Sequence, residues 1–427
     1  MAATDPLADT LDTAPLARVL ADTVGEGGAS ARVTEAAEAA EKAVIGLRRW
    51  FHAHPEASLE ERRTAAAIAA QLEALGIECS QPLENAVVAT VRGTAPDAYG
   101  ENGEPCRRVL LRADIDALPV TEDTGLPFSS TAPGLMHACG HDCHAAMLLG
   151  AAAVLQANRD LLAGEVRLVF QPAEECSRGA RMLVDAGVCE GVDAAWGCHI
   201  WSELPSGTVS VQPGPRMANA DWWRVEVRGT SAHGALPHRG ADAVVAGAAI
   251  VEQLQTVVSR QVSPFEPVVV TVGQFHGGTA KNVIAGSAWL EGTVRTFDPE
   301  VHARVPLLMK RVVEDTAEAF GCTAQVTEYT LGSWAVVNDP AVTEVARKAA
   351  AEMLGEAALV DYRGSMPGED FSEYLFEVPG CFVFLGCSTT GTDHCWPQHS
   401  CRYNPDESVL VNGVKLAAQF ALDYLAG

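Results

Sequence analysis

The stretch Met136–Gly150, MHACGHDCHAAMLLG, gathers residue types that bind metal ions. It holds three of the twelve histidines and two of the twelve cysteines of the chain, and it then becomes an apolar helix of small residues. Cys139 and His141 are one residue apart, a spacing that on a loop lets them reach two adjacent ions. Thiolate, imidazole and carboxylate ligands suit zinc, cobalt, nickel or manganese. The alternative is a helix N-terminus with buried thiols and a capping Asp142, so residues elsewhere must decide.

Further candidate ligands lie far from this stretch in the sequence. Glu174 and Glu175 follow an apolar run in the order Phe-Gln-Pro-Ala-Glu-Glu, where an extended backbone would point them in opposite directions. His199 follows a second apolar run, and His399 lies on an expected loop before the last helix. An adjacent glutamate pair is common on solvated surfaces, and a lone histidine after a strand is usually a core residue. Taken singly, none of these residues indicates a site.

Together with the opening stretch they form a set of five ligands for two divalent ions: Cys139, His141, Glu175, His199 and His399. Divalent ions lower the pKa of water towards about 7, so a neighbouring carboxylate can accept its proton near neutrality. Glu174 is the candidate for that general base. The pattern therefore predicts a hydrolytic two-metal site.

The elements that must position these residues alternate between strands and helices. Apolar runs at 87–91, 109–113, 166–170, 194–198 and 382–385 are typical of buried strands. Helical periodicity covers 31–51, 59–75, the segment from the opening stretch to residue 158, 342–354 and 407–425. Polar residues follow three of the strands directly, which predicts an α/β sheet that carries its site along one edge.

The pattern changes near residue 214. Strands expected at 222–228, 268–275, 288–297 and 324–330 and long helices at 241–260 and 299–320 follow the order β-α-β-β-α-β of a ferredoxin-like fold. We therefore expect an inserted α+β domain at 214–330, within an α/β/α catalytic domain with a mixed sheet formed by 31–213 and 331–427. Residues 1–30 are expected to be a flexible tail.

Composition limits the function classes. A chain of 427 residues is long enough for two domains. Its net charge of −25 argues against nucleic acid or an anionic membrane as a partner. No run of apolar residues is long enough to span a membrane, and no secretory signal is visible. Twelve irregularly spaced cysteines in such a chain indicate reduced thiols, and hence the cytoplasm.

Several motifs at these spacings resemble one family. They are RADIDALP, MHACGHDCHAAMLLG, FQPAEE, GCHIW, SAHGALPHRGADAV, GGTAKNVI and GEDFSEY. The chain resembles the amidohydrolase branch of the aminoacylase/carboxypeptidase metallopeptidases, over residues 40 to 425. Hippurate hydrolases, N-acyl-amino-acid amidohydrolases and plant indole-acetyl-amino-acid hydrolases belong to that branch. Around His399 and in Trp201-Ser-Glu203 this sequence departs from the usual pattern, which affects specificity more than chemistry.

The resemblance implies roles for the candidate ligands. It assigns the five ligands named above to a two-metal site, with Cys139 as the bridging ligand and manganese, zinc, cobalt or nickel as the ion. Glu174 resembles the general base that later donates its proton to the leaving amine. Asp114 resembles a carboxylate that supports a ligand without binding the ion.

Other roles implied by the resemblance fall in the inserted domain. His233 matches a histidine that stabilises the developing oxyanion. Asn282 and Arg295 match positions that bind the carboxylate or amide of the substrate. The inserted domain also carries the subunit contact in that family, so a homodimer or a higher homo-oligomer is expected.

The leading hypothesis is a metal-dependent amidohydrolase that cleaves the amide of N-acetyl or N-aroyl amino acids. A dipeptidase or carboxypeptidase with the same two-metal site is the first alternative. A second makes Cys139 a covalent nucleophile with His141 or His144 as its base. A catalytically silent binding protein is a third, although none of the predicted ligands has been replaced.

Overall fold

Seven strands form the sheet that carries the candidate site in the computed structural model, which describes residues 16–17 and 27–427. The predicted tail at 1–30 therefore lies mostly outside the described residues. The spatial order of the strands is β1 (Cys79–Ser80), β2 (Val87–Arg92), β4 (Glu165–Gln171), β3 (Arg108–Asp114), β5 (Ala194–Pro205), β15 (Gly380–Ser388) and β6 (Val209–Ser210). The four central strands β4, β3, β5 and β15 run parallel, and β2 and β6 pair antiparallel at either side. The expected mixed sheet is confirmed.

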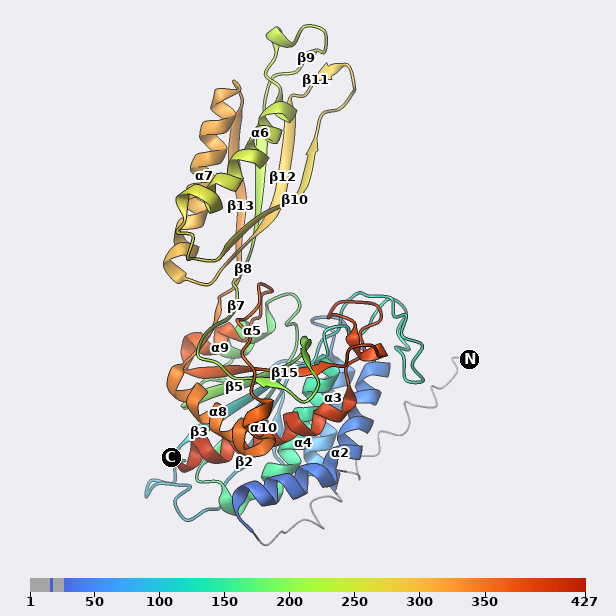
Figure 1. The fold of residues 1–427 in the computed structure, drawn as a ribbon, viewed down its shortest axis with the longest axis vertical. Coiled ribbons are helices and arrows are strands. Elements are labelled where there is room, and N and C mark those ends of the chain that lie inside the picture. The colour runs from blue at the N-terminus through green and yellow to red at the C-terminus, as the bar shows by residue number, and fades with distance from the viewer. Residues whose placement is uncertain (1–15, 18–26) are drawn as a thin grey trace. The chain divides into compact units, whose positions relative to one another are not determined.

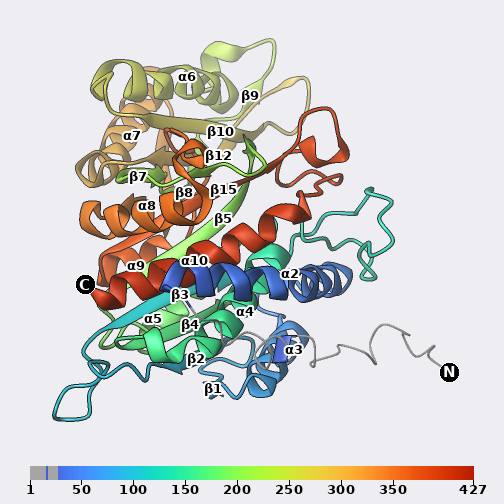
Figure 2. The same cartoon turned by 60° about the horizontal axis from the view of Figure 1, so that its bottom comes forward.

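Helices pack on this sheet (Figures 1 and 2). They are α2 (Ala29–Ala53), α3 (Arg62–Ala74), α4 (His141–Ala157), α5 (Gly179–Asp185), α8 (Pro340–Leu354), α9 (Ser372–Glu377) and α10 (Leu410–Ala426). Short 3-10 turns join them at Arg159–Leu161, Glu356–Ala358, Asp393–Cys395 and Glu407–Val409. Helix α4 lies between α2 and α10 and also contacts β3 and β5, so nearly all of it is buried. The small-residue sequence permits this packing, because a Cβ on Gly150 would lie 2.7 Å from both Val44 and Val414.

A second sheet of four antiparallel strands has the order β10 (Val268–Gly277), β12 (Ser287–Thr296), β8 (Ala220–Arg228) and β13 (Thr323–Ser333). Helices α6 (Ala243–Thr256) and α7 (Pro299–Ala319) cover one face, with a 3-10 turn at Pro237–Arg239 before α6 and a π-helical turn at Val257–Gln261 after it. A short ribbon pairs β9 (Ala232–His233) with β11 (Val283–Ile284). The β-α-β-β-α-β order is the expected ferredoxin-like arrangement.

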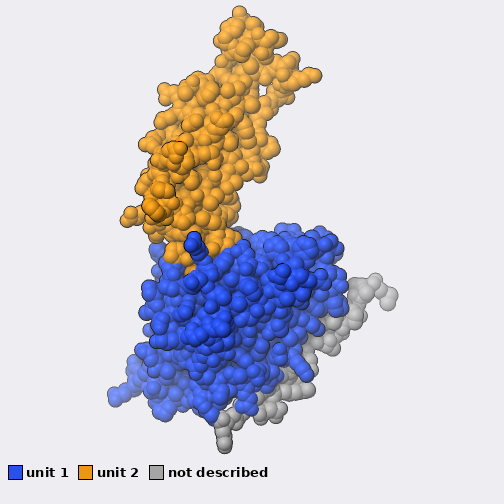
Figure 3. Space-filling model, viewed as in Figure 1, with its two compact units in different colours: residues 1–214, 337–363, 373–427 blue, residues 215–336, 364–372 orange. Residues whose placement is uncertain are grey.

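The chain divides into two compact units, coloured in Figure 3. Unit 1 consists of residues 1–214, 337–363 and 373–427, and unit 2 of residues 215–336 and 364–372. The chain passes between them through β7 (Gly214–Met217) and β14 (Val336–Asn338). Unit 2 thus includes a segment, 364–372, that the sequence analysis assigned to the catalytic domain.

Two local expectations about the backbone were wrong. His199 does not end its strand, because β5 pairs with β15 as far as Pro205 and leaves His199 in mid-strand. Glu174 and Glu175 do not lie on extended backbone, because the chain turns after β4 and Ala173 adopts φ 57°. Both differences bring the side chains towards the start of α4.

Among the described residues, one apolar helical segment, Glu407–Ala426, is long enough to cross a membrane. Its apolar window is 72% buried inside the protein, in contact with α2, α4 and α8. This is the burial of a core helix.

Candidate metal centre

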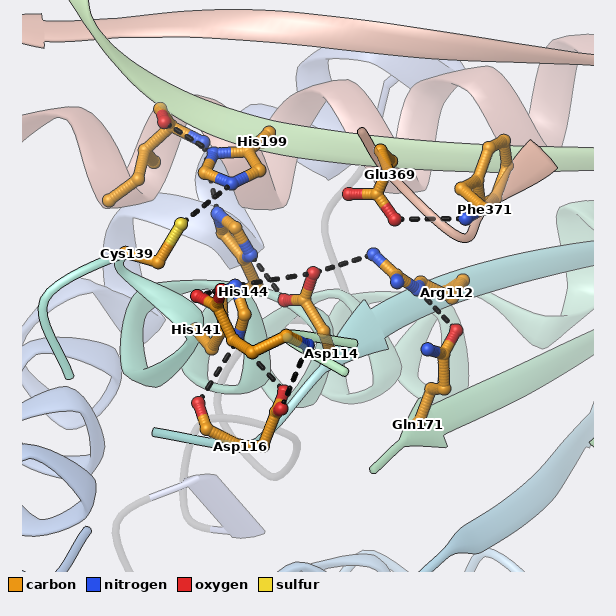
Figure 4. A network of polar contacts seen from close by, with 12 residues as sticks. Arg112, Asp114, Asp116, Cys139, His141, His144, Gln171, His199, Glu369 and Phe371 are labelled. Carbon is orange, nitrogen blue, oxygen red and sulfur yellow. Dashed lines mark hydrogen bonds and ion pairs between the residues drawn. The ribbon is translucent and has the colours of Figure 1, made fainter. Parts of the chain in front are cut away.

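The candidate ligands of unit 1 come from four segments that meet beside the start of α4. Figure 4 shows Cys139, His141 and His199 with the neighbouring Asp114, Asp116 and His144. Cys139 and His141 flank Gly140, the N-cap of α4, whose φ of 101° belongs to the left-handed region. A Cβ on Gly140 would lie 2.6 Å from Ile200 and 3.1 Å from the hydroxyl of Tyr403. The turn therefore requires glycine, both for its backbone and for the space.

The ligand atoms lie at the spacing of a metal site. The Sγ of Cys139 is 3.5 Å from Nε2 of His199. The Oε1 of Glu175 is 3.8 Å from Nε2 of His141 and 3.7 Å from Nε2 of His399. Ligand atoms around a tetrahedral ion with bonds of about 2.0–2.3 Å stand roughly 3.3–3.8 Å apart. All five predicted ligands thus come together, with Cys139 within 4.8 Å both of the pair His141 and His199 and of the pair Glu175 and His399.

Two of these atoms are buried without a hydrogen-bond partner among the described residues: Nε2 of His141 and Oε1 of Glu175. Burial of an unsatisfied polar atom costs free energy, so such a pair indicates a bound ligand. At 3.8 Å they are too far apart to bond each other. A divalent ion between them would satisfy both atoms, so the residues fit the expected metal.

The imidazole rings are oriented by contacts on their other nitrogen. Nδ1 of His199 lies 2.6 Å from the carbonyl oxygen of Ile200, and Nδ1 of His141 lies 3.0 Å from that of Asp116. A carbonyl only accepts, so each Nδ1 carries a proton and each Nε2 faces the site. Burial also lowers the pKa of His199 well below its usual range, which keeps its ring neutral.

His144 and Asp114 lie directly behind the ligands. Nδ1 of His144 donates to Asp114 at 2.5 Å, and its Nε2 accepts the backbone N–H of Ile200 at 3.0 Å. Both ring nitrogens of His144 are therefore occupied by protein groups. Asp114 also pairs with Arg112 at 2.6 Å and lies 3.7 Å from Nε2 of His141. Burial opposes ionisation, but Arg112 and the two histidines hold the pKa of Asp114 well below its usual value.

Asp116, which from the sequence could either orient ligands or cap a turn, holds two ligands in place. Its carbonyl and Oδ1 both face Nδ1 of His141, at 3.0 and 3.1 Å. Its Oδ2 accepts the backbone N–H of Glu175 at 3.0 Å and the hydroxyl of Ser58 at 2.7 Å. The signal in the sequence is its place two residues after Asp114, just beyond the end of a buried strand.

The carboxylates make the site strongly negative. Burial alone would lower the pKa of His141. The negative charges of Asp114, Asp116 and Glu175 outweigh the effect of burial and raise the pKa of His141 to about 10. Burial raises the pKa of Glu175 to about 7 against the opposing charge of His141. Such a potential attracts cations to the same position.

The same negative charges act on the thiol of Cys139. Burial and the nearby carboxylates of Glu175 and Glu174 raise its pKa well above the usual value. This suppresses the thiolate that a covalent nucleophile would need. A divalent ion would deprotonate the thiol by coordination.

Glu174 is buried beside the ligands, with an exposure of 8%. A carboxylate oxygen of Glu174 lies within 4.8 Å of ligand atoms of both His141 and Glu175. The side chain predicted as general base therefore reaches the position between the ligands.

The three remaining predicted residues belong to unit 2. His233 and Asn282 lie together on the β9–β11 ribbon, where His233 pairs with Val283 and Gly234 donates to the carbonyl of Asn282 at 2.8 Å. Arg295 lies near the far end of β12, with Nη1 3.0 Å from the carbonyl of Val294. Burial lowers the pKa of this guanidinium.

Along β12, Ser287 and Arg295 are eight positions and about 27 Å apart, and the ribbon lies beyond Ser287 (Figure 1). His233 and Arg295 of one chain thus stand too far apart to contact the same small molecule. Their contacts with substrate stay predictions.

Comparison with known proteins identifies the family of this chain. The sequence pattern of peptidase family M20/M25/M40 matches residues 110–423. The N-acetyl-L-cysteine deacetylase of Bacillus subtilis is 42% identical over 87% of this chain and 85% of its own length. Thermostable carboxypeptidase 1 of Saccharolobus solfataricus is 37% identical over 89% of this chain and 95% of its own. The chain belongs to peptidase family M20/M25/M40.

A solved member of the M20 family shows the same fold. The crystal structure of the Bacillus subtilis YXEP protein, described as a dinuclear metal binding peptidase, superimposes with a TM-score of 0.79. It is 36% identical, and the match covers 91% of this chain and 99% of that one. The resemblance inferred from the motifs is confirmed, and with it a hydrolase that acts on amide bonds and uses divalent metal.

Proposed function

We propose that this M20 enzyme hydrolyses the amide bond of N-acyl amino acids, such as N-acetyl or N-aroyl amino acids, to a carboxylic acid and a free amino acid. The observation that carries the proposal is the pair of buried atoms on His141 and Glu175 that have no hydrogen-bond partner in the described part of the chain, with Glu174 directly beside them. Two divalent ions at the five ligands would polarise the scissile carbonyl and lower the pKa of a water molecule towards about 7.

The residues of the chain perform the proton transfers. Glu174 accepts a proton from the attacking water and later donates it to the nitrogen of the leaving amine. Asp114 and Asp116 hold His141 and Glu175 in the orientation that this transfer needs. The raised pKa of Cys139 argues against a covalent nucleophile.

Unit 2 supplies the remaining contacts in this proposal. His233 stabilises the developing oxyanion, and Asn282 and Arg295 bind the carboxylate or amide of the substrate. Since His233 lies on the ribbon beyond one end of the four-stranded sheet and Arg295 lies near its other end, a single active centre that uses both takes them from two chains. A homodimer therefore forms part of the proposal.

An exposed apolar patch on unit 2 supports the dimer. Val244 and Val245 on α6 are 36% and 49% exposed, Phe275 on β10 is 37% exposed and Val283 on β11 is 40% exposed. The patch is continuous, because a Cβ on Gly247 of α6 would touch the ring of Phe275. Strand β10 is also an edge strand with an unpaired side. Analytical ultracentrifugation should show a dimer that Val245→Asp dissociates and Leu307→Asp, at a residue on α7 with 68% exposure, leaves intact.

A panel of substrates tests the reaction. We expect N-acetyl and N-benzoyl amino acids to be cleaved faster than unblocked dipeptides. The second candidate is a carboxypeptidase or dipeptidase, favoured by the relative named thermostable carboxypeptidase. Faster cleavage of peptides with a free amino terminus would replace the first function by the second.

Manganese, zinc, cobalt and nickel are each tested as the ion. We propose the cytoplasm as the location of the enzyme, without nucleic acid or membrane partners.

A further inference from the structure

A group of buried charged side chains lies at the C-terminal end of α2, next to the turn that carries Cys139 and His141. Arg48 is fully buried there. Its Nε lies 2.9 Å from Oδ2 of Asp142, and its Nη1 donates to Oε1 of Glu407 at 3.1 Å. Asp142 follows His141 directly in the sequence. One guanidinium thus joins the start of α4 to the 3-10 turn before α10.

Glu407 belongs to the segment that carries the last ligand. The chain runs from His399 to Glu407 in eight residues without a helix or strand. His399 itself is 58% exposed in its side chain and has φ 66°, and its backbone N–H donates to the carbonyl of Ala138 at 2.7 Å. This ligand lies on a loop, so its position depends on contacts at the ends of that loop.

A second connection runs through His52. Its Nδ1 lies 2.8 Å from Oδ2 of Asp142, and its Nε2 lies 3.3 Å from Oε1 of Glu122. Ionised carboxylates only accept, so both ring nitrogens donate and the ring is an imidazolium. Burial and Arg48 lower the pKa of His52, but the two carboxylates outweigh them and raise it.

Glu122 continues this connection to the His399 loop. Its Oε2 accepts the backbone N–H of Ser130 at 2.6 Å, which closes the loop after β3 on itself. The neighbouring Asp123 donates its backbone N–H to the carbonyl of Cys401 at 2.8 Å and accepts from Nε of Arg402 at 3.1 Å. Two chains of contacts therefore link Asp142 to the segment 399–407.

Stability alone does not account for such an arrangement. Buried ion pairs lose most of their Coulomb gain to desolvation, and apolar residues of similar volume are often as stabilising. Unlike an apolar residue, a guanidinium carries several N–H groups in one rigid plane, and it can therefore hold two carboxylates in fixed directions. Arg48 forms an ion pair with Asp142, which is next to a ligand, and donates a hydrogen bond to Glu407, at the end of a ligand-bearing loop.

We propose that Arg48 is a positioning residue of the metal site, which acts through Asp142 and Glu407. It fixes the turn that carries Cys139 and His141 relative to the loop that carries His399, so that both parts of the ligand set bind the ions together. This inference rests on the two-ion site of the proposed function.

The same pair of helices contains a matched control. Arg32, near the N-terminal end of α2, donates to Asn158 at 2.8 Å and to Asp160 at 2.7 and 2.8 Å. Asn158 and Asp160 follow the C-terminal end of α4. Arg32 thus joins α2 to α4 as Arg48 does, but 16 residues earlier on α2, about 24 Å from Arg48.

The test measures metal affinity directly, without a substrate. The full chain is stripped with a chelator and titrated with Mn²⁺ or Zn²⁺ by calorimetry, as wild type, Arg48→Lys and Glu407→Gln. Both variants keep the bulk of the side chain, and Glu407 is 16% exposed, so Glu407→Gln disturbs folding least. We expect each to weaken ion binding about 10- to 100-fold, the loss typical when partners of metal ligands are removed. The controls Arg32→Lys and Asp160→Asn should bind the ions as the wild type does.

Circular dichroism and thermal unfolding of the same samples separate positioning from folding. If Arg48→Lys does not fold, Glu407→Gln decides the test. Wild-type affinity in Arg48→Lys and Glu407→Gln, or an equal loss in the two controls, would overturn this inference alone. A wild-type chain that binds no divalent ion would overturn the proposed function as well.

Discussion

Nε2 of His141 and Oε1 of Glu175 face each other across 3.8 Å, both buried and both without a hydrogen-bond partner among the described residues. Nδ1 of the same histidine and the backbone N–H of the same glutamate both bond to Asp116. A single aspartate thus orients two ligands from different segments towards one point.

Glu174→Gln should retain both ions and lose turnover. The amide keeps the size of the side chain but cannot accept a proton, and general-base catalysis contributes roughly 10²- to 10⁴-fold. Steady-state kinetics with an N-acetyl amino acid and metal analysis of the same sample check this. Glu190→Gln, at an exposed carboxylate of unit 1, is the control and should have wild-type kcat. Turnover within a few fold of wild type in Glu174→Gln would refute the base assignment.

Removal of metal should destabilise unit 1. An ion that binds only the folded state contributes about 2.7 kcal/mol per site when its concentration is 100 times Kd. Calorimetric scans with chelator and with added Mn²⁺ or Zn²⁺ should therefore differ clearly in Tm. His141→Ala should abolish most of this difference, whereas His238→Ala, on an exposed turn of unit 2, should preserve it. A Tm that does not respond to metal in the wild type would contradict the site.

Gly140→Ala should damage the site more than its backbone strain alone explains. Left-handed backbone costs a non-glycine residue roughly 1–2 kcal/mol, and here the added Cβ would also meet Ile200 at 2.6 Å. Gly207→Ala is the matched control, since Gly207 has φ 83° but no atom within 4 Å of an added Cβ. Urea unfolding should show a larger loss for Gly140→Ala, and metal affinity should fall only in that variant. Equal effects of the two substitutions would argue against the close packing of the turn.

The pair of His52 and Glu122 should make stability depend on pH in a defined window. The folded pKa of Glu122, about 2, lies below its unfolded value near 4.3, so its contribution is complete above that value and lost as the pH falls. The pKa of His52 is raised, so its contribution is complete below about 6.5 and lost as the pH rises through the folded pKa.

The loss of free energy of unfolding caused by Glu122→Gln should therefore be largest between pH about 4.5 and 6.5, on the order of 2 kcal/mol. Urea unfolding of chelator-treated protein across pH 3 to 9 measures it. A difference that stays constant over this range would show that the two side chains do not form an ion pair.

The hydrophobic periodicity and the polar residues that follow the strands were sufficient to predict most of the architecture. The apolar strands of unit 1 and the β-α-β-β-α-β order of unit 2 are local patterns, and both were correct. The length of β5 was missed, because Trp201-Ser-Glu203 alternates weakly and its pairing with β15 involves residues about 185 positions away. The turn at Glu174 was missed because it depends on left-handed backbone at Ala173, which alanine rarely adopts.

Within the site, residue types indicated the ligands but not their supports. The role of Asp116 stayed open between orienting ligands and capping a turn, because its carboxylate bonds to His141 and Glu175, which lie 25 and 59 positions away. The role of Arg48 depends on Glu407, 359 positions later in the chain. A pattern in one sequence does not contain such long-range pairs, since only the folded sheet and helices bring them together.

A metal titration tests directly whether two bound ions make this chain an amidohydrolase. Chelator-treated protein is assayed for hydrolysis of an N-acetyl amino acid while Mn²⁺ or Co²⁺ is added in measured equivalents, with bound metal counted in parallel. We predict no hydrolysis without metal and a rise that saturates at two bound ions per chain. Full activity in the metal-free protein, or two bound ions with no cleavage of any N-acyl amino acid, would contradict it.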